Sequence, residues 1–247
     1  MASKRTFFLP ATTGAALALL VTACGDDVTD PGALLASAEA EAIVRSAAAL
    51  PSLGTLIEVF EPAGDADRAT LLQAHELWTA GTAADDERGR AQRRVAVRHA
   101  SPILARTVPG EEWVEVRERL DRWIGTADLM LEHLRLPEVD DRIAAARRYL
   151  QRADAATVAE GRPHFLLLAA AELVETTPAF VARRLAADAD AALARTDRAP
   201  SVLEEPGLER ARRLKDWAVR AVDEEDYLLA IQRAYYALQL VNEREAQ

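Results

Sequence analysis

The stretch PGEEWVEVRERLDRWIGTADLMLEHLR, residues 109–135, decides the fold class of this 247-residue chain. Its apolar residues recur at spacings of three and four, which places a single apolar stripe along a helix. The stripe consists of Trp113, Val116, Leu120, Ile124, Ala127, Met130 or Leu131, and Leu134. Glu111 and Glu112 fall in the first turn, where negative charge is favoured by the helix dipole. The pattern predicts a long amphipathic helix with one face against a core.

Helix-forming composition extends outward from this segment over most of the chain. Half of the residues are hydrophobic but only 5% are aromatic, and the abundant alanine, leucine, arginine and glutamate head the helix scale. No stretch alternates apolar and polar residues as a half-buried strand does. Short turns between helices favour antiparallel neighbours. We therefore expect an all-α fold of about nine antiparallel helices, either a closed helical bundle or a short α-solenoid.

Periodicity and the prolines between periodic segments predict where these helices lie. The expected ranges are 32–50, 67–80, 85–107, 109–135, 137–160, 163–176, 178–195, 207–222 and 224–244, with a short ambiguous segment at 53–61. An interruption is expected at Ser101-Pro102, because a residue before proline avoids helical angles. Residues 165–171 are all apolar, so their helix should lie centrally.

The first twenty-four residues follow a different pattern. Basic residues at positions 4 and 5 precede an uncharged, mainly apolar run over residues 7–21. At about 15 residues this run is shorter than the roughly 20 that cross a bilayer as a helix. A positive start, a short apolar middle and small residues before a cleavage site are typical of a secretory signal peptide. The run ends in Val21-Thr22-Ala23-Cys24, and Cys24 is the only cysteine of the chain.

This tetrapeptide resembles the lipobox of bacterial lipoproteins, in which an aliphatic and two small residues precede cysteine. The resemblance covers residues 1–24 and implies that the leader is cut before Cys24 and that acyl chains attach there. Two or more acyl chains anchor a protein stably, whereas one binds a membrane only marginally. The expected organisation is a signal peptide at 1–23, a lipidated acidic tether at 24–31 and a single helical domain at 32–247. The alternative is a plain secretory signal with a chance cysteine.

The lipoprotein resemblance also predicts the location and the chemistry of the mature chain. Gly25, rather than aspartate, follows the cysteine, which in that family implies the outer rather than the inner membrane, on its periplasmic side. Loss of the leader leaves 28 basic and 40 acidic residues. That strong negative charge argues against nucleic acid as a partner and against electrostatic docking on anionic lipid. We expect membrane contact only through the acyl chains on Cys24.

Residues 214–241 are similar to one tetratricopeptide-repeat hairpin. The matching residues are Leu214, Trp217, Ala218, Asp226, Tyr227, Ala230, Ala237, Leu238 and Leu240. Ala221, Ala234 and Asn242 depart from the family pattern, and no second copy follows at the spacing of about 34 residues that arrays need. The alternative is an ordinary helical hairpin. The resemblance implies a surface for peptides or partner proteins, with Trp217, Tyr227 and Tyr235 as candidate contacts.

A run of arginines interrupts the acidic sequence. Residues 88–110 contain six arginines and no acid, and Arg90, Arg94 and Arg98 lie four apart on one helix face. This face predicts contact with an acidic partner, a lipid headgroup or a cell-wall polymer. The alternative is a solvated face that is offset by neighbouring acids and by acids elsewhere in the fold.

No motif for catalysis or cofactor binding is recognisable. The four histidines, His75, His99, His133 and His164, fall on four different expected helices, without the spacing of known metal-binding helices. Glycine-rich phosphate loops and nucleophile turns are missing from the sequence. We therefore expect no cofactor, and a non-enzymatic, lipid-anchored scaffold that binds a protein or peptide partner. The open alternatives are a helical carrier of a metal or small ligand and an envelope enzyme with an unrecognised carboxylate site.

Overall fold

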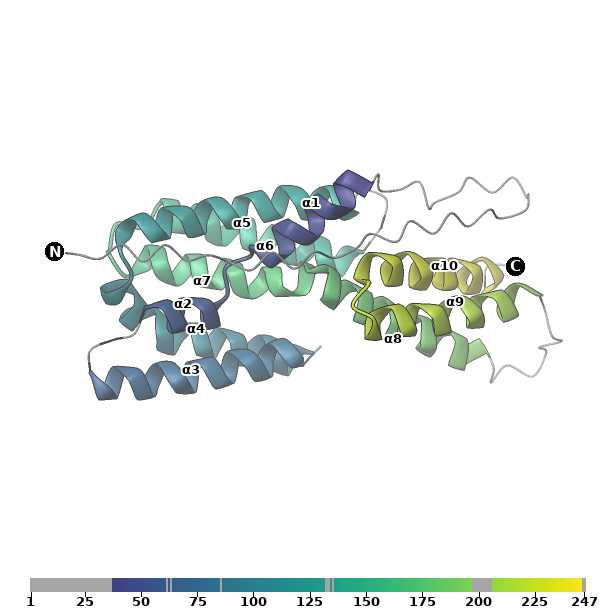
Figure 1. Ribbon diagram of the computed structural model, residues 1–247, viewed down its shortest axis with the longest axis horizontal. Helices are drawn as coiled ribbons and strands as arrows, with labels where there is room; N and C mark the ends of the chain where they lie inside the picture. Colours follow the sequence, from purple (N-terminus) through teal and green to yellow (C-terminus); the bar gives the residue numbers. More distant parts are fainter. Residues whose placement is uncertain are drawn as a thin grey trace. The chain divides into compact units, whose positions relative to one another are not determined.

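Every regular element in the described part of the chain is a helix, which confirms the all-α class (Figure 1). The computed structural model describes residues 37–60, 62, 64–84, 86–131, 134, 136–196 and 206–245. Its elements are α1 (Ser37–Ala48), α2 (Leu53–Val59), α3 (Asp65–Ala83), α4 (Glu87–Thr107), α5 (Gly110–Leu131), α6 (Pro137–Asp154), α7 (Gly161–Leu173), the 3-10 turn η2 (Val174–Thr176), α8 (Pro178–Thr196), α9 (Pro206–Asp223) and α10 (Tyr227–Glu245). The predicted signal peptide and tether, with Cys24, lie outside these residues.

The apolar helix α7 lies centrally, as predicted. It packs against α4, α5 and α6, and Figure 1 shows it between α4 and the pair formed by α5 and α6. Leu166, Leu167, Ala169 and Leu173 are at most 1% exposed. Because alanine is small, neighbouring helix axes can approach α7 closely. The predicted stripe of α5 is buried as well, from Trp113 to Leu131.

A bend after α7 leads the chain into a second group of helices. Thr177 stands before Pro178 and takes extended angles, φ −70° and ψ 149°, as expected for a residue before proline. The helical segments on either side, 161–176 and 178–196, are bent by 45°. Beyond the bend, α8 packs against both α9 and α10. The segment from α7 to α8 is therefore common to both groups of helices.

The predicted interruption at Ser101-Pro102 is wrong. Helix α4 continues through Pro102 to Thr107, although the local preference disfavours it. Ser101, Ile103 and Leu104 are all buried by this path, and the Ser101 hydroxyl lies 2.9 Å from Nδ1 of His164 on α7. Tertiary packing outweighs the proline effect here, whereas the helix does break before Pro178.

Two predicted boundaries also need correction. Helix α6 ends at Asp154 rather than near residue 160, and Thr157 is exposed, because the chain there reverses into α7. Helix α10 begins at Tyr227 rather than at residue 224. Glu225 has a φ of 61°, and the N–H groups of Glu225 and Asp226 donate to Val222 O at 3.1 Å and Ala221 O at 2.8 Å. This is the Schellman arrangement that ends a helix, so residues 223–225 close α9 and Asp226 precedes α10.

Within the described ranges, no single helix is both long enough and apolar enough to cross a membrane. Two pairs of helical segments would be long and apolar enough only if each bent pair were counted as one span. They are Glu41–Ala48 with Leu53–Val59, and Gly161–Thr176 with Pro178–Thr196.

Helices α3 and α4 approach each other through two buried glycines. A Cβ placed on Gly81 would lie 2.6 Å from Gly89 O, and one placed on Gly89 would lie 2.7 Å from Ala84 O. Backbone atoms cannot yield as flexible side chains do, so a methyl group at either position would force the helices apart. Gly125 in α5 provides a contrast, because a Cβ placed there would have no neighbour within 4 Å.

We predict that Gly89→Ala lowers the free energy of unfolding by about 1–3 kcal/mol, the usual effect of overpacking. Gly125→Ala, the same change in an open helical position, should raise it by about 0.5–1 kcal/mol. Urea unfolding followed by circular dichroism measures both. Equal effects of the two substitutions would contradict the close approach of α3 and α4.

Candidate functional site

Arg93 of α4 is buried, with 1% of its surface exposed. Its Nε donates to Ala171 O at 3.1 Å, Nη1 donates to Gly81 O, and Nη2 forms an ion pair with Glu175. Burial lowers the pKa of Arg93, and the carboxylate of Glu175 opposes that shift. Arginine nevertheless stays protonated in proteins. Arg93 therefore places a positive charge where α3, α4 and the end of α7 meet.

Two buried carboxylates, Glu172 and Glu175, gather the arginines around this point. Glu172 accepts from Arg94 at 2.7 Å and from Arg142 at 2.8 Å. Glu175 accepts from Arg93 and, at 3.2 Å, from Arg90. The hydrogen bond to Glu172 raises the pKa of Arg94. We call these six residues the arginine–glutamate cluster; four cations against two anions give it an excess of positive charge.

A polar cavity of about 440 Å³, the arginine pocket, opens on one side of the cluster. Its lining consists of Arg94, Asp141, Arg142, Ala145, Arg148, Tyr149, Arg152 and Glu172. The guanidinium of Arg152 lies over the ring of Tyr149, 6.0 Å from its centroid. Four arginines face two acids, so the pocket is positively charged. Its residues come from α4, α6 and α7.

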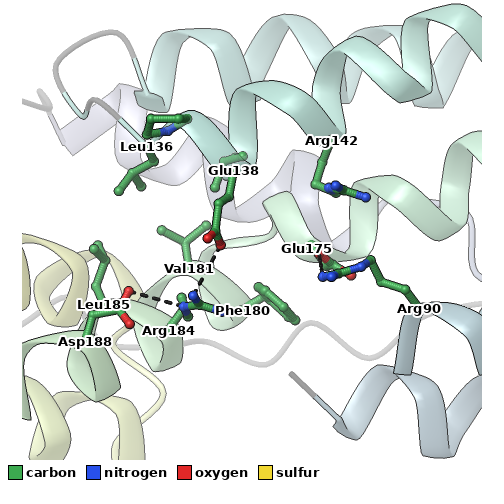
Figure 2. Close-up of a pocket in the computed structure, with 12 residues that line it drawn as sticks. Arg90, Leu136, Glu138, Arg142, Glu175, Phe180, Val181, Arg184, Leu185 and Asp188 are labelled. Atoms are coloured by element: carbon green, nitrogen blue, oxygen red, sulfur yellow. Dashed lines mark hydrogen bonds and ion pairs between the residues drawn. The ribbon is translucent and has the colours of Figure 1, made fainter. Parts of the chain in front are cut away.

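A second cavity of about 210 Å³, the bend pocket, lies where η2 leads into α8. Its lining consists of Arg90, Leu136, Pro137, Glu138, Val139, Arg142, Glu175, Phe180, Val181, Arg184, Leu185 and Asp188. Figure 2 shows Arg184 between Glu138 and Asp188, at 3.3 and 3.2 Å. The charges balance here, and half of the lining is apolar. The two pockets therefore offer different chemistry on either side of one cluster.

The structure separates the three predicted arginines. Arg90 and Arg94 bind the buried glutamates of the cluster, so their charges are offset by acids far away in the sequence. Arg94 keeps half of its side chain exposed and lines the arginine pocket. Arg98 lies outside both pockets. The pKa of His164 is lowered mainly by burial of its ring, and the positive charge of Arg98 lowers it further. Contact of this face with an acidic partner stays a prediction.

The candidate residues of the C-terminal hairpin also lie outside both pockets. Trp217 on α9 is 43% exposed, and Arg233 lies 5.7 Å from its ring centroid. Arg233 also donates to Trp217 O at 3.1 Å. Tyr227 and Tyr235 on α10 are half-buried against the main core. The hairpin is present, but its residues and the arginine–glutamate cluster form separate surfaces.

The histidines are not gathered into one place in the described residues. His133 lies outside those residues, and no group of three His, Cys, Asp or Glu side chains among the residues described could hold a metal ion. His164 contacts the buried hydroxyl of Ser101, and this pair links α4 to α7.

Sequence reasoning missed Arg93, Glu172 and Glu175. A signal was present, because Glu172 and Glu175 are the only charged residues between positions 165 and 182, and buried charges are usually paired. The acid-free arginine run was the complementary signal. Arg148, Tyr149 and Arg152 gave no comparable signal, because they lie on a helix of mixed charge.

Comparison of the chain with protein-family models, with curated proteins and with solved structures finds no match.

We predict that Arg93→Met lowers the free energy of unfolding by about 3–5 kcal/mol, because it leaves a buried carboxylate short of a partner. The matched control is Arg117→Met, which removes ion pairs with Asp121 and Asp154, two carboxylates that are about half exposed to solvent or more. That change should cost only about 0.2–1 kcal/mol. Chemical denaturation measures both variants, and similar losses would show that Arg93 has no special structural role.

Proposed function

We propose that the chain is a lipid-anchored, non-enzymatic helical scaffold of the bacterial cell envelope that binds an acidic protein or peptide partner. The observation that supports this best is the arginine pocket, a positively charged cavity in a chain of net charge −10. Local positive potential in a cleft attracts anionic ligands whatever the overall charge. Guanidinium groups present paired donors that match carboxylates in two-point contacts.

The pocket combines fixed and available arginines. Arg94 and Arg142 are oriented by Glu172, which is 3% exposed. Arg148 and Arg152 are exposed, and neither has an acidic partner among the residues that the structure describes. Arg152 is held by its contact with Tyr149. A partner's carboxylates can therefore bind at Arg148 and Arg152 without breaking the buried cluster.

The carboxylates of the site suit binding better than catalysis. The oxygens of Glu172 and Glu175 already accept hydrogen bonds from arginines, so both carboxylates serve to orient those arginines. The lining of the arginine pocket contains no serine, threonine, cysteine or histidine. The envelope location depends on the lipobox resemblance at Cys24.

We predict that replacing both Arg148 and Arg152 by glutamine weakens binding of a fluorescent oligoglutamate by about tenfold or more, since charge-assisted hydrogen bonds are lost. Fluorescence anisotropy on the full chain in detergent at low salt measures the affinity. Arg210→Gln with Arg213→Gln on α9 removes the same charge from another exposed surface and should change the affinity little.

Two outcomes of this titration would contradict the proposal. Equal weakening by both double variants would mean that oligoglutamate responds only to net charge. Failure of the unaltered chain to bind oligoglutamate at low salt, where screening is weakest, would remove the acidic-partner function itself.

We predict that Cys24→Ser moves the protein from the membrane fraction to the soluble periplasmic fraction, because the acyl chains lose their attachment atom. Thr22→Ser keeps a small residue at its position and should leave fractionation unchanged. Mass spectrometry of the mature N-terminus identifies the modification directly. Membrane retention of the Cys24→Ser protein would contradict the anchor.

A further inference from the structure

The arginine pocket and the bend pocket follow one another along α6. Residues 136–142 line the bend pocket and residues 141–152 line the arginine pocket, so Arg142 belongs to both. The walls formed by α4 and by the end of α7 follow the same order. Arg90 and Glu175 line the bend pocket, and Arg94 and Glu172, which come one turn along their helices, line the arginine pocket. We call the surface that the two adjoining pockets form along α6, bordered by α4, by the end of α7 and, at the bend pocket, by α8, the α4–α6 groove.

The length of the groove suits an extended peptide. Val139 in the bend pocket and Tyr149 in the arginine pocket are ten residues apart on α6, which corresponds to about 15 Å at 1.5 Å per residue. An extended chain advances about 3.3 Å per residue. Because successive side chains of an extended chain point to opposite sides, two side chains about four residues apart on one peptide point the same way and would reach both pockets at once.

The two ends of the groove suit different side chains of a bound peptide. Leu136, Val139, Phe180, Val181 and Leu185 give the bend pocket an apolar wall. Its charged residues are already in ion pairs: Arg142 pairs with Glu172 of the arginine pocket, and the others pair among themselves. An apolar side chain entering there leaves water without separating those ion pairs. The arginine pocket has an excess of positive charge and exposed guanidinium groups, so it suits the carboxylates of a bound peptide.

We propose that the α4–α6 groove binds an extended acidic segment of a partner protein, with an apolar side chain in the bend pocket and a pair of carboxylates about four residues away in the arginine pocket. This proposal rests on the proposed function, which requires only the arginine pocket, and adds the pattern of the partner and the seat of its apolar residue. The Arg142–Glu172 ion pair separates the two subsites.

The test uses labelled peptides and the full chain in detergent. A series of otherwise neutral peptides carries one leucine and one Asp-Asp pair at increasing separations and in both orders. Two control peptides replace the leucine by serine or the Asp-Asp pair by Asn-Asn. We expect the tightest binding at a separation near four residues, and about tenfold weaker binding of each control peptide, since burial of one leucine and pairing of two charges are each of that size.

Two protein variants locate each side chain on the groove. Val139→Phe places a larger side chain in the bend pocket; it should abolish the advantage of the leucine peptide over its serine control and leave the serine peptide's affinity unchanged. Val158→Phe is the matched control, because Val158 is 71% exposed and lies outside both pockets. Arg148→Gln with Arg152→Gln should abolish the advantage over the Asn-Asn peptide. A double-mutant cycle compares the combined effect of a peptide change and a protein change with the sum of their separate effects, and so measures whether the two side chains interact.

Several results would overturn the inference, and they separate it from the proposed function. If the serine peptide binds as tightly as the leucine peptide, or Val139→Phe leaves their ratio unchanged, the apolar subsite is wrong while the acidic-partner function stands. If affinity does not depend on separation, the two-pocket geometry is wrong. If the Asn-Asn peptide binds as tightly as the acidic one, the inference and the proposed function both fail.

Discussion

The buried charge of Arg93 is the constraint on which the other features depend. One guanidinium reaches the backbone of α3, the backbone of α7 and the carboxylate of Glu175. A buried charge is costly unless it is paired and hydrogen-bonded, so these three partners must stay in place together. The glycine contact between α3 and α4 is needed for the same reason, because Gly81 supplies one of the acceptors. Helices α3, α4 and α7 are thereby fixed relative to one another.

This constraint also forms the surface that we propose for binding. Glu172 and Glu175 lie one helical turn apart at the end of α7, and each recruits a further arginine from α4 or α6. The carboxylates neutralise only part of the arginine charge, so positive potential remains at the surface on α6. The chain bends between Thr177 and Pro178, and the bend pocket, with half of its lining apolar, lies at that bend. The two proposed subsites adjoin because the acids of α7 and η2 come directly before the bend.

The proposed site combines two kinds of arginine. Arg94 and Arg142 are oriented by the buried carboxylate of Glu172, while Arg148 and Arg152 are exposed. Binding of a partner would therefore have to order only the exposed pair. Attachment through Cys24, which we propose, would place the groove at a membrane surface without any requirement for basic residues towards the lipid. The acidic remainder of the chain would then favour selectivity by repelling acidic partners that miss the groove.

The sequence by itself determined the helical class, the stripe of α5, the central place of α7 and the lipobox resemblance, because each depends on local periodicity or on a short contiguous motif. Tertiary structure decided the rest. Helix α4 continues through Pro102 since burial on both sides outweighs the local angle preference, and Trp123, outside the predicted stripe, is buried where its indole donates to Thr176 at 2.8 Å. Arg90 and Arg94, which the sequence places on an outward basic face, bind glutamates about eighty residues away. Spacing along one helix gives the direction of a side chain but not the charge that meets it, and that depends on how distant helices pack.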